Sequence, residues 1–129
     1  MTESDYIELI ILAKSSAGTN ANNFIAVMFA YIVASYFVGE SLSRIQAWGI
    51  SIIYSLFTLL PIYGVYLDIG LNYSLQQEFH ATFPDEAIKL YSGTSGSGVM
   101  IFFVPALLAA AWLASILHMA YIRRGNLND

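Results

Sequence analysis

The chain has 129 residues, of which 57% are hydrophobic and only 11% are charged, and its mean hydropathy is +0.62. Soluble domains carry about 25% charged residues, so this composition excludes an ordinary soluble domain. The net charge of −4 without a basic patch argues against nucleic acid as a partner, and the lack of cysteine excludes disulfides and thiolate metal sites.

The first twenty residues predict a short amphipathic helix, which we expect either at the membrane interface or packed beside the membrane helices. Thr2 and Asp5 have the spacing of a capping box. The apolar stretch that follows has about eleven residues, whereas a crossing of the hydrocarbon core needs about 20. Gly18, Thr19 and Asn20 are expected to end this helix at residue 20.

Three further segments are apolar enough to cross a membrane: residues 21–40, 44–67 and 99–122. The stretches Ile45 to Leu67 and Val99 to Ile122 contain no acidic or basic residue. Glu40 and Arg44 mark a turn between the first two segments, because one helix through both would cross the core about twice. We predict an all-α integral membrane protein, a single membrane domain (1–129) with three transmembrane helices.

Residues 68–98 predict a helical extramembrane segment that connects the second and third spans. Apolar side chains recur every four positions at Leu71, Leu75 and Phe79. This periodicity indicates that the second helix continues beyond the membrane. A second short helix is expected from Thr82, followed by a flexible Gly/Ser linker at residues 92–98.

The basic residues predict an orientation. Arg44, Arg123 and Arg124 flank the spans on one side, against Lys14 and Lys89 on the other. The positive-inside rule then places the tail, residues 123–129, in the cytoplasm and the N-terminus outside, which makes residues 68–98 extracytoplasmic. We expect a multi-pass protein of a bacterial cytoplasmic (inner) membrane.

Small residues are spaced at four-residue intervals in the first and third spans. The positions are Ala26, Ala30 and Ala34 in the first span, and Ala106, Ala110 and Ala114 in the third, where Ser115 belongs to a parallel row with Ala111. Within lipid, small side chains let helix backbones approach closely, so the rows predict seams that pack against each other or against a neighbouring protein. The alternative is that alanine is simply common in membrane helices.

Pro61 and Gly64 in the second span and Pro105 in the third predict structural kinks. Broken helices also mark transporter sites, but there ionisable or polar ligands accompany the break. No ionisable residue lies in the central part of any span, which argues against a proton-coupled pump. His80 and His118 fall at opposite ends of the bundle, so we expect no metal and no cofactor.

These features favour a small membrane protein without enzymatic activity. We expect an accessory or assembly subunit whose partners are lipids and either other transmembrane proteins or further copies of this chain. The first alternative is an oligomeric pore former, because three spans with an outside N-terminus resemble the architecture of one holin class. The second alternative is a cofactor-dependent subunit of a membrane enzyme.

Overall fold

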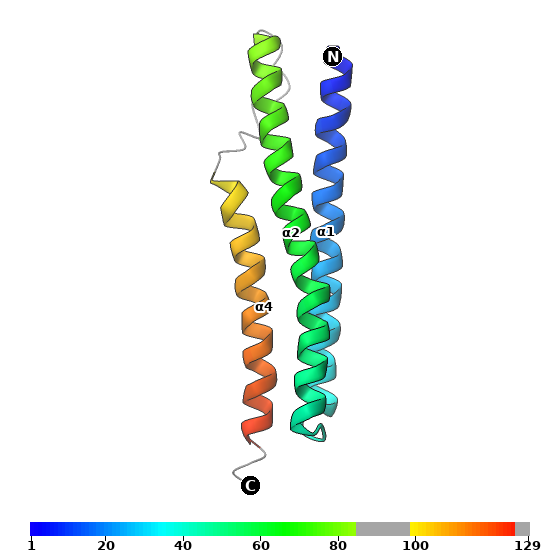
Figure 1. Cartoon of the computed structure of the whole chain (residues 1–129), viewed down its shortest axis with the longest axis vertical. Coiled ribbons are helices and arrows are strands. Elements are labelled where there is room, and N and C mark those ends of the chain that lie inside the picture. The colour runs from blue at the N-terminus through cyan, green and yellow to red at the C-terminus, as the bar shows by residue number, and fades with distance from the viewer. Residues whose placement is uncertain (85–98, 126–129) are drawn as a thin grey trace.

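The computed structural model describes residues 1–84 and 99–125, and the long secondary-structure elements in these residues are all α-helices. The helices are α1 (Glu3–Val38), α2 (Arg44–Thr82) and α4 (Met100–Gly125). Figure 1 shows them side by side along one long axis, with α2 antiparallel to both others. All three are long and apolar enough to cross a membrane, which confirms the predicted all-α class and the number of such helices in this part of the chain.

Helix α1 is longer than predicted and replaces the separate N-terminal helix. The capping box is confirmed, since the Thr2 hydroxyl accepts from the Asp5 amide and the Asp5 carboxylate accepts from the Thr2 amide. The helix does not end at Gly18–Asn20, however, but continues to Val38 over 36 residues, about 54 Å at 1.5 Å per residue. The predicted boundary at residue 20 is therefore wrong.

Contacts with α2 explain why α1 continues through these residues. A glycine such as Gly18 costs a helix only about 1 kcal/mol relative to alanine, which packing against a neighbouring helix outweighs. The Thr19 hydroxyl donates to the Ser15 carbonyl within the helix, and the Asn20 side chain donates to Asp68 on α2. These polar groups thus support the helix or the helix pair instead of ending α1.

The first half of α1 and the last part of α2 pack together as an antiparallel pair beyond the start of α4 (Figure 1). Their core is a cluster of Tyr6, Ile10 and Phe79, in which the rings of Tyr6 and Phe79 meet edge to face at 6.0 Å. Helix α2 reaches Thr82, as its apolar periodicity predicted. The expected second short helix and the Gly/Ser linker lie outside the described residues.

A tight turn joins α1 to α2, as predicted. Ser43 caps α2 by a second capping box: its hydroxyl accepts from the Gln46 amide, and the Gln46 side chain accepts from the Ser43 amide. Both charged residues of this turn, Glu40 and Arg44, are exposed. The turn therefore separates two helices and does not bury an ion pair between Glu40 and Arg44.

Candidate functional site

The three helices meet around two stacked tyrosines in the half of the bundle near this turn. Tyr31 of α1 and Tyr54 of α2 are buried, with ring centroids 3.8 Å apart. The Tyr31 hydroxyl lies 2.9 Å from the Ser51 hydroxyl on α2, and the Tyr54 hydroxyl lies 2.6 Å from the Ser115 hydroxyl on α4. The pair therefore links all three helices through hydrogen bonds in an apolar environment.

Trp112 completes this polar cluster. Its indole N–H donates to the Ser55 hydroxyl at 3.1 Å, and its carbonyl accepts from the Ser115 hydroxyl at 2.6 Å. In the described residues no buried side-chain nitrogen or oxygen lacks a hydrogen-bond partner. The cluster thus positions helices, since each of its polar groups is already engaged.

A second polar contact joins α1 and α2 farther along the bundle. One carboxylate oxygen of Asp68 accepts from the Ser16 hydroxyl at 2.8 Å and from the Asn20 amide at 2.9 Å. Gly64 lies beneath the Asn20 side chain, where an added Cβ would come 2.7 Å from the amide nitrogen. The kink predicted at Gly64 stays a prediction, and the structure adds that Gly64 is the place where Asn20 approaches α2.

Neither proline interrupts the helix that contains it. Helix α2 continues through Pro61, and α4 continues through Pro105. Any bend at these residues stays a prediction.

The alanine rows do not pack against each other within the chain. All six alanines are exposed: Ala26, Ala30, Ala34, Ala106, Ala110 and Ala114. Ser115 differs, because it is buried and bonded to Tyr54. The side chains buried inside the bundle are others, both large ones such as Phe24 and Tyr31 and small ones such as Ala47. Of the two predicted uses of the rows, packing within the chain is therefore wrong.

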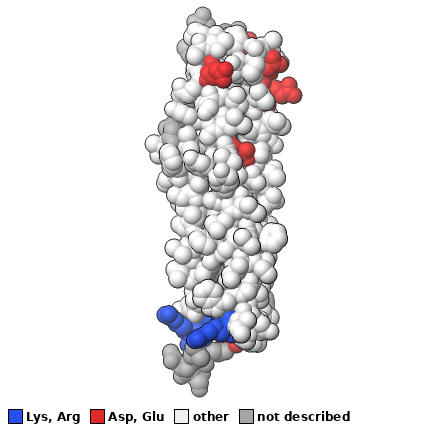
Figure 2. All heavy atoms as spheres, in the orientation of Figure 1, with Lys and Arg blue, Asp and Glu red and all other residues white. Residues whose placement is uncertain are grey.

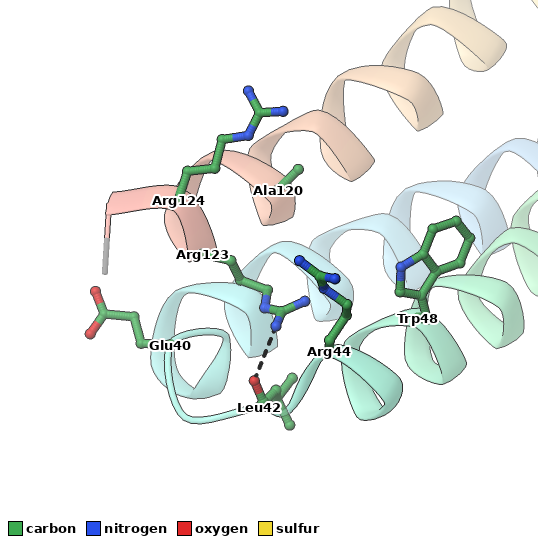
Figure 3. Close-up of a pocket in the computed structure, with 7 residues that line it drawn as sticks. All are labelled: Glu40, Leu42, Arg44, Trp48, Ala120, Arg123 and Arg124. Atoms are coloured by element: carbon green, nitrogen blue, oxygen red, sulfur yellow. Dashed lines mark hydrogen bonds between the residues drawn. The ribbon is translucent and has the colours of Figure 1, made fainter. Parts of the chain in front are cut away.

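The three arginines that carried the orientation prediction gather at one end of the bundle. Figure 2 shows the basic side chains there and most acidic side chains at the other end of the same face. An open pocket lies between the α1–α2 turn and the end of α4 (Figure 3). Its lining residues are Glu40, Leu42, Arg44, Trp48, Ala120, Arg123 and Arg124. Spacing along the sequence did not reveal this pocket, because Arg44 and Arg123 are 79 positions apart.

Within the described residues, no group of three or more His, Cys, Asp or Glu side chains is arranged to hold a metal ion. His80 lies near the end of α2, whereas His118 lies near the opposite end of the bundle on α4. The two histidines are therefore not brought together.

Comparison with known proteins gives no relative: no family model matches the chain, and neither a curated protein nor a solved structure shows significant similarity.

Proposed function

We propose that this chain is a small polytopic membrane protein that acts through helix–helix contacts as an accessory or assembly subunit of a membrane complex. The observation that carries the proposal is the exposure of both alanine rows. Helices in lipid gain little from hydrophobic exclusion, so close approach over small side chains is a main source of their association. Two such surfaces that the chain itself leaves uncovered suit contacts with another transmembrane helix.

The directions of the rows support this proposal. Ala30 lies six residues after the buried Phe24, which places it about 120° from that side chain around α1. Ala110 lies five residues before the buried Ser115, about 140° away around α4. Each helix thus has one face for its own bundle and a separate face of small residues for a partner.

The hydroxyl groups of the spans favour this function over the pore-forming alternative. An aqueous lumen between copies of the chain would be lined by outward-facing polar groups. The hydroxyls of Ser51, Ser55, Thr58 and Ser115 instead make hydrogen bonds within the bundle. The predicted location in a bacterial inner membrane, with the arginine end in the cytoplasm, belongs to the same proposal.

Copurification from gently solubilised native membranes tests the proposal. A tagged chain should retain its partner, and Ala30→Phe or Ala110→Phe should reduce the retained amount by about tenfold, because a large ring prevents close backbone approach. Ile25→Phe is the matched control, since Ile25 is already exposed on another side of α1.

Migration of the wild-type chain only as a lone monomer would overturn the proposal. So would equal partner recovery from the alanine variants and the control. Abrupt loss of membrane potential on induced expression would favour the pore former instead.

A further inference from the structure

The pocket at the arginine end gathers the positive side chains of Arg44, Arg123 and Arg124 with one acidic side chain, Glu40. Figure 3 shows the side chains of Arg44 and Arg123 extending into the space between the α1–α2 turn and α4, while the Glu40 carboxylate points away. Arg123 is half-buried and donates to the Leu42 carbonyl at 3.4 Å. In the described residues neither arginine forms an ion pair with a carboxylate. The planar guanidinium presents paired donors that match the oxygens of a phosphate group.

An apolar groove continues from this pocket between α2 and α4. The two hollows share Trp48, Ala120 and Arg123. The remaining residues of the groove are Ala47, Ser51, Ile116 and Met119. Ser51 and Ile116 lie about two turns inward from the helix ends that hold Arg44 and Arg123, so the groove leads from the charged end toward the apolar middle of the bundle.

Aromatic residues place this pocket at the level of a membrane boundary. Trp48 is 66% exposed on α2, and Tyr121 is exposed on α4 at the same end of the bundle. Exposed Trp and Tyr side chains are enriched at the depth of lipid headgroups, where one part of the ring is in apolar surroundings and the polar atom reaches water. A lipid phosphate lies at this depth in a bilayer.

We propose that this pocket and groove bind one anionic phospholipid. Its phosphate lies between the guanidinium groups of Arg44 and Arg123, and the first part of an acyl chain occupies the groove beside Ala120 and Met119. The combination of a charged pocket with an adjoining apolar groove distinguishes a phospholipid from free phosphate, which uses only the charged part. Binding of a lipid at this site is a property separate from the helix–helix contacts proposed above.

The binding test uses the full chain purified in a neutral detergent, so that membrane orientation does not affect the result. Dioleoylphosphatidylglycerol and dioleoylphosphatidylcholine are added in increasing amounts, and native mass spectrometry counts the bound lipids. We expect about a 25-fold preference for the anionic lipid, since each of the two arginines near the lipid headgroup contributes about fivefold.

Arg44→Gln should lower this preference by about fivefold, and Arg44→Gln with Arg123→Gln should abolish it. Arg44 is exposed, so the single variant leaves the helix contacts intact even if the double variant loses helix content by circular dichroism. Lys14→Gln, which removes one positive charge near the other end, is the matched control and should bind as the wild type does. Equal binding of the two lipids by the wild type, or an unchanged preference in Arg44→Gln, would overturn the proposal.

A second pair of variants tests the groove. Ala120→Phe fills the space next to Met119 and should weaken dioleoylphosphatidylglycerol binding by about fourfold, the equivalent of about one buried methylene group. Leu117→Phe is the control, because Leu117 is 60% exposed and lines neither hollow.

Inorganic phosphate distinguishes the two sources of a phosphate group. It should displace the dioleoyl lipid only at a large excess. Displacement at equal concentration, or undiminished lipid binding by Ala120→Phe, would show that the groove holds no acyl chain and would overturn the phospholipid assignment.

Glu40→Gln should change binding of the anionic lipid in the opposite direction to the arginine variants. Glu40 lines the pocket and repels an anion there, so its neutralisation should strengthen binding of the anionic lipid by about twofold to fivefold. Weaker binding in this variant would contradict an anion site.

Discussion

The rings of Tyr31 and Tyr54 stack with their planes inclined by only 9°, and their hydroxyls point to partners on different helices. Tyr31 bonds to Ser51 on α2, whereas Tyr54 bonds to Ser115 on α4. One aromatic pair therefore connects α1, α2 and α4. Its hydrogen bonds, in the interior of the bundle, fix how the three helices are arranged around it.

Removal of the Tyr54 hydroxyl should destabilise the bundle modestly. Tyr54→Phe keeps the ring stack, and Ser115 keeps its bond to the Trp112 carbonyl, so we expect a loss of about 1 kcal/mol in the free energy of unfolding. Tyr54→Ala also removes the ring and should cost about 3 to 5 kcal/mol. Unfolding by sodium dodecyl sulfate in mixed micelles measures both values. Tyr63→Phe is the control, because Tyr63 is 60% exposed, and an equal loss in this variant would contradict the prediction.

Two glycines of α2 should respond differently to alanine. At Gly49 nothing lies within 4 Å of the added Cβ, so Gly49→Ala should stabilise the helix by about 0.5 to 1 kcal/mol. At Gly64 the Cβ would displace the Asn20 amide and break its bond to Asp68. Gly64→Ala should therefore be at least about 1 kcal/mol less stable than Gly49→Ala.

The same micelle unfolding experiment measures this difference. Addition of Asn20→Ala to both glycine variants should remove most of the difference in stability between them, because no Asn20 amide is then left to displace. Equal stabilisation by the two single glycine variants would show that Asn20 does not restrict α2.

The antiparallel pair formed by the first half of α1 and the last part of α2 should open independently of the rest. Phe79 is fully buried between Tyr6 and Ile10, so Phe79→Ala leaves a cavity at the far end of this pair. Hydrogen exchange should become faster in residues 3–16 and 70–82, with no change around Tyr54. Leu71→Ala is the control, since Leu71 is exposed, and uniform acceleration along all three helices would contradict local opening.

High pH should loosen the same pair. The Tyr6 hydroxyl donates to Glu78 at 2.9 Å, and this bond raises the pKa of Tyr6 above its usual value near 10. Because the pKa of Tyr6 is higher in the folded state, its hydrogen bond to Glu78 stabilises the folded pair fully below pH 10. This stabilisation is lost as the pH rises through the raised pKa. The thermal midpoint should fall more between pH 9 and about 11.5 in the wild type than in Tyr6→Phe. Tyr121→Phe, at the opposite end of the bundle, should behave as the wild type does, and an identical pH profile for Tyr6→Phe would contradict the prediction.

Orientation in the membrane should depend on the arginine end. Arg44→Glu exchanges one of three positive charges there for a negative charge and should produce mixed orientation. Reporter fusions at the N-terminus, at residues 92–98 and at the C-terminus measure the proportions. Arg44→Lys retains the charge and should keep the wild-type orientation. A cytoplasmic N-terminus in the wild type would contradict the predicted direction.

The amino-acid sequence by itself determined the helical class, the three apolar segments and the turn marked by Glu40 and Arg44. These features depend on local chemistry: the length of uninterrupted apolar residues, and capping pairs such as Thr2 with Asp5. The extension of α2 to Thr82 could be predicted for the same reason, since its periodicity is visible within one segment.

Only the tertiary structure decided how α1 continues and which faces are covered. Gly18 and Asn20 favour a helix end when judged alone, but a bond from Asn20 to Asp68, 48 positions away, offsets that preference. The exposure of Ala30 and the meeting of Arg44 with Arg123 likewise depend on how each helix is rotated about its axis. That rotation is set by contacts between distant residues, such as Tyr54 with Ser115, and no pattern within a single segment contains it.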